Sequence, residues 1–278
     1  MLVYYFRFSL KPVAVPDSFG ALSEKGQLYS REEWLRYYFS EQREFEHQKQ
    51  DFAFIPEHNI GMNKPEHLII GYIARPRVVA ERAPPSDGFH PVEHQSWRGA
   101  LIVIDPTSHK DGQKIALEHR SDIGKPISVL KSLARSMSVG DEPPPFDVQI
   151  DPIVEASSFW NFAEQNDFNI NWLSFDAAPP NMFGGAGDYK DEMRMLREKN
   201  RVNRVKTTMT SDTTIDVLAG NIKEVVDYTE MGAGSIRART ADNKTYNSKN
   251  YIKQDSIDAE YDSEDFWSKI GEWLGERF

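Results

Sequence analysis

The side chains best suited to chemistry are the basic ones of residues 184–211, where seven Lys and Arg side chains occur with only four acidic ones. A glycine-rich turn, a helix over about 188–200 and a strand over 204–210 fit this stretch. Because a helix turns about 100° per residue, four of the cations fall within an arc of about 60°. These four are Lys190, Arg194, Arg197 and Arg201. They predict either a solvated helix face or a surface that follows nucleic-acid phosphates, which means binding rather than catalysis.

Four further cations could extend this stripe. Alternation along the strand over 204–210 turns Arg204 and Lys206 away from its apolar side. In a later strand over 235–240, Arg237 and Arg239 likewise lie opposite the apolar residues. If the two strands are neighbours, their cations form one surface with the helix. The alternative is a sheet edge that charge protects from aggregation.

Two acidic or histidine groupings suggest metal chemistry. The order His90-Pro-Val-Glu93-His94 matches an inverted zinc-protease pattern, but that chemistry needs a stable helix, and here we predict a proline-rich loop. Asp147, Asp151 and Glu155 share one face of a predicted strand.

Paired carboxylates of this kind can hold Mg²⁺, so this group, or Asp176, keeps a metal-dependent nuclease open as an alternative. The lysine partner that such a nuclease uses does not fall at a strand spacing beside them. We therefore expect no catalytic residues, no metal and no cofactor.

Composition narrows the possible classes further. The 278 residues include no Cys, which excludes disulfides, thiolate metal sites and cysteine nucleophiles. The N-terminus lacks the pattern of a signal peptide, so we expect a soluble cytoplasmic protein without direct membrane insertion. The net charge is −10, and residues 251–278 hold eight acidic groups but only three basic ones. Because salt screens repulsion over about 10 Å, local basic patches can still bind nucleic acid.

These residues must be positioned by helices and strands, and the sequence pattern of those elements predicts an α+β protein. For residues 1–142 we expect a mixed α+β domain, with strands over 3–11, 51–55, 67–73, 99–104 and 114–119. Helices are predicted over 30–48, where Ser30 and Glu33 form a capping box, and over 125–138. Residues 80–97 are rich in proline and charge and predict a surface loop.

Three consecutive prolines at 143–145 mark the expected domain boundary. Residues 143–259 then read as βαβαβαββ, which favours an α/β-plait-like domain with several helices on one face of a sheet. Residues 260–278 form an acidic segment and an amphipathic helix. Its apolar stripe (Phe266, Ile270, Trp273, Leu274 and Phe278) would dock on the chain's own core or on a second subunit, and we expect a homodimer or larger homo-oligomer.

The second half of the chain resembles the RexA-like phage-exclusion and KwaB-like antiviral defence proteins. The resemblance is carried by VQIDPIVE, residues 169–175, Pro180-Asn181, RVKTTMTS and DYTEMGAGSIRART. It implies a bacterial or prophage-encoded defence protein that binds DNA with little sequence preference and works as an oligomer, with a possible partner protein from the same operon. The leading hypothesis is thus a non-enzymatic DNA-binding protein. The alternatives are a nuclease and a protein-interaction module.

Overall fold

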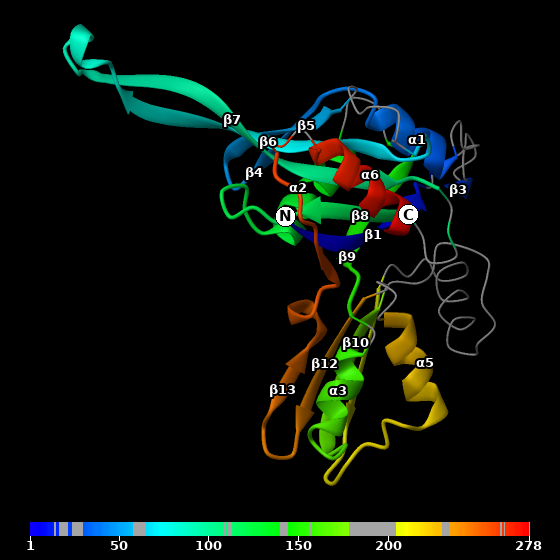
Figure 1. Cartoon of the computed structure of the whole chain (residues 1–278). Coiled ribbons are helices and arrows are strands. Elements are labelled where there is room, and N and C mark those ends of the chain that lie inside the picture. Colours follow the sequence, from blue (N-terminus) through cyan, green and yellow to red (C-terminus); the bar gives the residue numbers. More distant parts are fainter. Residues whose placement is uncertain are drawn as a thin grey trace.

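The computed structural model describes residues 1–13, 30–57, 65–107, 109, 113–139, 144–155, 157–177, 204–229, 234–261, 263 and 265–277, with the backbone of 15–16 and 22–23. The described chain is α+β, with a large antiparallel sheet and a smaller one below it in Figure 1. A third, two-stranded sheet joins β2 (Val15–Pro16) and β3 (Leu22–Ser23).

The larger sheet has eight strands, and all of their pairings are antiparallel. Its order is β14-β1-β8-β7-β6-β5-β4, and β9 also pairs with β1. The strands are β1 (Leu2–Pro12), β4 (Arg43–His47), β5 (Gln50–Pro56), β6 (Ile69–Arg82), β7 (Pro91–Asp105), β8 (Gln113–Glu118), β9 (Phe146–Pro152) and β14 (Gln254–Ser256).

Helices cover both faces of this sheet. On one face, α1 (Arg31–Tyr38) and α2 (Pro126–Met137) bury a core that includes Phe6 and Phe8. On the other face, α6 (Phe266–Arg277) packs against a second core that includes Val3 and Tyr5. The alternation of Val3, Tyr5, Phe6 and Phe8 along β1 therefore serves two cores at once.

The first predicted helix is shorter than expected. It begins at the predicted capping box, since Ser30 Oγ accepts a bond from the Glu33 amide at 3.2 Å and Glu33 Oε2 accepts one from the Ser30 amide at 2.7 Å. It ends at Tyr38, and residues 43–47 form β4 instead. The reason is a two-residue period, because Phe45 and His47 are buried while Glu44 and Glu46, which alternate with them, are exposed.

The predicted loop over 80–97 is a β-ribbon instead. Strands β6 and β7 stay paired from Ile69↔Ile104 out to Arg82↔Pro91, and the ribbon extends far from the rest of the molecule in Figure 1. Its turn contains η1 (Pro85–Asp87) and a left-handed Gly88. Proline misled the sequence interpretation, because both edges of an isolated ribbon are free and tolerate prolines such as Pro76 and Pro91.

The strand that follows the proline run belongs to the larger sheet. Strand β9 pairs with the second half of β1, from Phe6↔Pro152 to Pro12↔Phe146, while β14 pairs with its first three residues. The smaller sheet therefore arises from residues inserted between β9 and β14. The chain therefore leaves the larger sheet after Pro152 and returns to it at Gln254. The boundary between the sheets is not at the proline run over 143–145, where the sequence predicted a domain boundary.

The smaller sheet is built from four antiparallel strands in the order β11-β10-β12-β13. They are β10 (Ile170–Ala177), β11 (Val205–Thr210), β12 (Gly234–Thr240) and β13 (Thr245–Asn247). Helices α3 (Ser158–Glu164) and α5 (Gly220–Tyr228) pack with Phe175 and Ile236 in one core, so both cover the same face, as the sequence predicts. The first strand of the predicted βαβαβαββ order is β9, which lies in the other sheet.

The apolar stripe of the C-terminal helix packs within its own chain. Phe266, Ile270, Trp273 and Leu274 are buried against the larger sheet, and Phe278 lies outside the described residues. These four side chains are therefore not available to a second subunit. The homo-oligomer remains a prediction, and it must use another surface.

Loss of the Trp273 side chain should destabilise the fold. Trp273 is 7% exposed, and removing a buried tryptophan costs roughly 3–5 kcal/mol. We expect Trp273→Ala to lower the free energy of unfolding in urea by about this amount without changing the mass seen by light scattering. Trp97→Ala is the control, because Trp97 on the ribbon is 53% exposed and should change stability by at most about 0.5 kcal/mol. A fall in mass would instead place Trp273 at an interface between subunits.

Asp255 should make stability depend on acid pH. Burial opposes its charge, but bonds from Tyr5 Oη (2.5 Å) and Trp273, with the charge of Arg277 (2.7 Å), outweigh burial and lower the pKa of Asp255 below its ordinary 3.8. The stabilisation is complete above pH 3.8 and is lost as the pH falls through the lower pKa of the folded state.

Asp255→Asn should therefore lower the free energy of unfolding by about 1–3 kcal/mol at neutral pH, with a smaller difference from wild type below pH 3.8. Asp258→Asn, at an exposed position, is the control. A deficit that stays constant down to the lowest pH at which the protein folds would contradict the charge argument.

Candidate nucleic-acid interface

The open face of the smaller sheet gathers cations from two strands. Residues directly opposite each other in a sheet share a face, and β10 lies between β11 and β12. Asp176 lies opposite Lys206, and Ser174 lies opposite Arg237. The predicted strands are therefore not direct neighbours, yet Lys206, Arg237 and Arg239 share the face that α3 and α5 leave uncovered.

These three cations are free to meet a ligand. Lys206, Arg237 and Arg239 are exposed, and none of them forms an ion pair with another residue that the structure describes. Trp172 lies on the same face, opposite Arg239, and is half-buried. Free cations that share a face with an aromatic ring form a surface that can hold phosphates and stack on bases.

Arg204, in contrast, is occupied. Its Nε lies 2.7 Å from Asp176 Oδ1, and its Nη1 lies 3.4 Å from Asp151 Oδ1. Burial opposes the charge of Arg204, but the two carboxylates outweigh burial and raise its pKa. Because Asp151 is on β9 and Asp176 is on β10, Arg204 joins the two sheets. We assign it a structural role.

Two further cations continue the surface beyond the sheet. Lys249 lies in η3 (Ser248–Asn250), directly after β13. The pKa of Lys249 is lowered, mainly by burial and next by the positive charges of Lys131 on α2 and of Arg237. These three cations are therefore close enough to act on one another. We call Lys131, Lys206, Arg237, Arg239 and Lys249 the cationic face. Sequence reasoning missed Lys131 and Lys249, because only the fold brings them together.

The cationic stripe predicted from the sequence spans residues 190–201. Lys190, Arg194, Arg197 and Arg201 lie outside the described residues. Their proximity to the cationic face remains a prediction from the sequence.

The acidic candidates lie beside cations. Asp151 is opposite Arg7 in the pairing of β9 with β1, and Asp147 is opposite Lys11. Glu155 follows the strand and is exposed. Within the described ranges, no three His, Cys, Asp or Glu side chains group in a way that could hold a metal ion. Neighbouring cations oppose divalent binding, so the geometry does not favour a nuclease site here.

The histidine pattern on the ribbon lacks the helix that zinc chemistry needs. His90 precedes β7, and Glu93 and His94 are consecutive residues within it, opposite Ala80 and Val79. Consecutive strand residues point to opposite faces. The pattern therefore cannot place its two histidines and the glutamate as the zinc proteases do.

Sequence reasoning also missed a buried carboxylate paired with a histidine. Asp105 is 1% exposed, and its Oδ2 lies 2.5 Å from His109 Nε2. The hydroxyl and the amide of Thr107 both donate to Asp105 Oδ1. The sequence pattern that could have revealed this group is Asp-x-Thr-x-His at the end of a strand. Because the same imidazole nitrogen contacts both Thr107 and Asp105, the group closes the end of β7, and we assign it no catalytic role.

Comparison with protein-family models, curated proteins and solved structures finds no match for this chain. The class that the fold and the surface define is an α+β protein with an open cationic sheet face. Among the described helices, none is both long and apolar enough to cross a membrane.

Replacing Arg204 should separate its structural role from binding. Arg204→Gln removes the contact of Arg204 with Asp151, whose side chain is 9% exposed, so we expect a loss of about 1–3 kcal/mol in the free energy of unfolding. Arg237→Gln is the matched control and should stay within about 0.5 kcal/mol. An unchanged stability of Arg204→Gln in urea unfolding would contradict this role.

Proposed function

We propose that this chain is a non-enzymatic, largely sequence-independent DNA-binding protein of bacterial antiviral defence, of the phage-exclusion type. The observation that carries the binding proposal is the register of the smaller sheet, which places Lys206, Arg237, Arg239 and Trp172 on the face that α3 and α5 leave uncovered. The resemblance of the second half of the chain to RexA-like and KwaB-like proteins supports the role in defence. We further propose that it acts in the cytoplasm as a homo-oligomer, with a partner protein from the same operon.

The chemistry of the cationic face favours sequence-independent contacts. Arginine and lysine side chains neutralise phosphates, which are the same in every sequence. Trp172 adds a ring on which any base can stack, because every base has a π-face. A flat sheet face presents neither a helix nor a protruding β-ribbon to a major groove, so we propose single-stranded DNA as the preferred form.

The net negative charge is compatible with this proposal. Much of the acidic excess lies in residues 251–278, and some of those carboxylates are paired: Asp255 contacts Arg277, and Asp265 contacts Lys269 at 3.0 Å. This segment packs on the larger sheet. Salt screens exposed charges beyond about 10 Å, so the cationic face can act locally.

A salt series tests the proposal. For single-stranded DNA, each phosphate contact contributes about 0.7 to the slope of log affinity against log salt. We expect Arg237→Gln and Arg239→Gln each to lower the slope by about this amount. Trp172→Ala should weaken binding by about 1–3 kcal/mol and leave the slope unchanged, because stacking releases no counterions. Fluorescence anisotropy with a labelled oligonucleotide measures both quantities.

Lys223→Gln is the matched control, since it removes one exposed positive charge from α5, on the other side of the sheet. Equal losses in Lys223→Gln and Arg237→Gln would point to general charge and not to the cationic face. Absence of binding to single- and double-stranded DNA at low salt would overturn the proposal. Incubation with plasmid, Mg²⁺ and Mn²⁺ tests the nuclease alternative, for which we expect no cleavage.

A further inference from the structure

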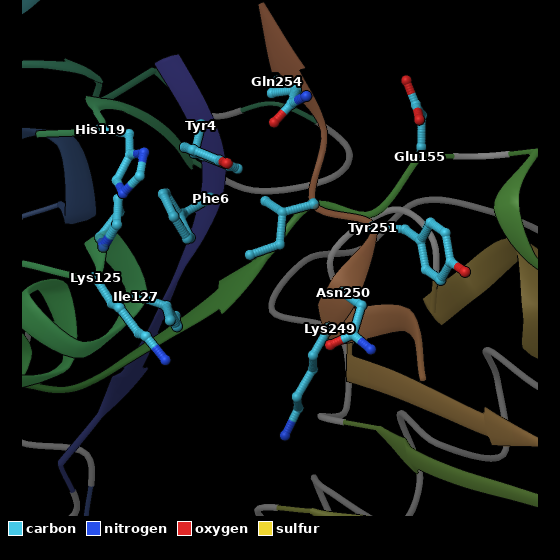
Figure 2. A pocket seen from close by; sticks show the side chains of 12 residues that line it. Tyr4, Phe6, His119, Lys125, Ile127, Glu155, Lys249, Asn250, Tyr251 and Gln254 are labelled. Atoms are coloured by element: carbon cyan, nitrogen blue, oxygen red, sulfur yellow. The ribbon is translucent and has the colours of Figure 1, made fainter. Parts of the chain in front are cut away.

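A pocket of about 370 Å³ lies where the two connections between the sheets pass each other. One connection leaves β9 and the other returns to β14, and they pair at Val154↔Ile252 and through the Glu155 amide to the Tyr251 carbonyl at 3.0 Å. Figure 2 shows residues of β1 and α2 on one side of the pocket and residues around η3 on the other. Its volume falls within the range of about 300–1,000 Å³ that is usual for small-molecule sites.

The inner wall of the pocket is apolar and aromatic. Phe6 is fully buried, while Tyr4, Ile127 and Ile252 are half-buried beside it. Tyr251 also lines the pocket, and its ring stacks on Tyr246 with centroids 5.3 Å apart and planes inclined by 15°. A wall of this kind suits a flat, apolar-faced group such as a heterocyclic ring.

The rim of the pocket is polar and mainly cationic. Lys125 and Lys249 are exposed and enter from opposite walls, with both ammonium groups on the same side of the pocket in Figure 2. His119 is also exposed, and it meets the Tyr4 ring edge-on at 5.5 Å. Two lysines with their ammonium groups on one side of a pocket suit an anion such as phosphate.

Carboxamides complete the rim. Asn250 and Gln254 both line the pocket, and each offers one acceptor and two donors. Glu155 is the acidic member, and its carboxylate points away from the two ammonium groups in Figure 2. Amide groups that both donate and accept can match the edge of a nucleobase, which also does both.

We propose that this pocket binds one nucleoside monophosphate unit, with the base against Tyr4 and Ile127 and the phosphate between Lys125 and Lys249. Lys249 lines the pocket and lies two residues after Asn247, which is opposite Arg237 of the cationic face. A DNA strand lying on that face would therefore bring an unpaired nucleotide to the pocket. In that form the inference rests on the proposed DNA-binding function. A free mononucleotide offers the same chemistry, and the experiment separates the two sources.

The test uses the full chain and dAMP as the probe, with binding measured by isothermal titration calorimetry. We expect deoxyadenosine, which lacks the phosphate, and deoxyribose 5-phosphate, which lacks the base, to bind at least tenfold more weakly than dAMP. Ile127→Trp should fill the pocket and weaken dAMP at least tenfold, while Lys125→Gln should weaken it severalfold. Lys223→Gln is the control and should bind dAMP as the wild type does. Lys125 is exposed, so that variant keeps the test valid if Ile127→Trp fails to fold.

The same variants are then tested with a short single-stranded oligonucleotide at low salt. Weaker DNA binding in Ile127→Trp and Lys125→Gln, with competition by dAMP, assigns the pocket to a nucleotide of the strand. Unchanged DNA binding together with weakened dAMP binding assigns it to a free nucleotide. If dAMP does not bind and both pocket variants hold DNA as tightly as wild type does, the pocket inference is overturned and the proposed function stands. If dAMP binds but no DNA does, the proposed function fails and the pocket remains a nucleotide site.

Discussion

The outer edge of β1 accepts two strands in succession, β14 along its first residues and β9 along the rest. Its other edge pairs with β8 from Val3 to Phe8, so this part of β1 is paired on both sides. Burying backbone groups without hydrogen-bond partners costs free energy, so both parts of this edge need a partner strand. The return of the chain from Asn247 to Gln254, which supplies β14, is therefore as necessary as its departure at Pro152. This arrangement holds the smaller sheet at two paired connections. It also sets the cations of that sheet beside α2, and it creates the pocket between the connections.

Two arginines of the smaller sheet, Arg204 and Arg237, have different roles because their neighbours differ. Arg204 forms ion pairs with two carboxylates, one from each sheet, and so links the two sheets. Arg237 lies opposite Ser174 and Asn247, which carry no charge, and so its guanidinium keeps its full attraction for an outside anion. A count of basic residues along the chain cannot distinguish these cases. The sign and distance of the cross-strand partner decide whether a cation supports the fold or binds a ligand.

Much of the fold follows from local sequence, and the differences have physical causes. The capping box at Ser30 and the alternation of Arg237 and Arg239 predict the start of α1 and the outward face of β12, as the structure shows. The β6–β7 ribbon escaped prediction because its prolines suit an isolated two-stranded ribbon as well as a loop. The assignment of β9 to the larger sheet escaped it because strand partners far apart in sequence leave no local signal. Lys131 and Lys249 were missed for the same reason, since 118 positions separate them and only the fold brings them together.

The pairing of the first strand with the last also bears on how the protein is made. The amino group of Met1 donates to the Ile257 carbonyl at 2.6 Å, across a separation of 256 residues. Synthesis runs from the N-terminus at about 5–20 residues per second, so β1 leaves the ribosome long before β14 exists. During that interval the start of β1 has an open edge, and Val3 and Tyr5 lack the helix that later covers them. Until β14 and α6 have been made, the start of β1 is therefore a place where wrong strand pairing can occur.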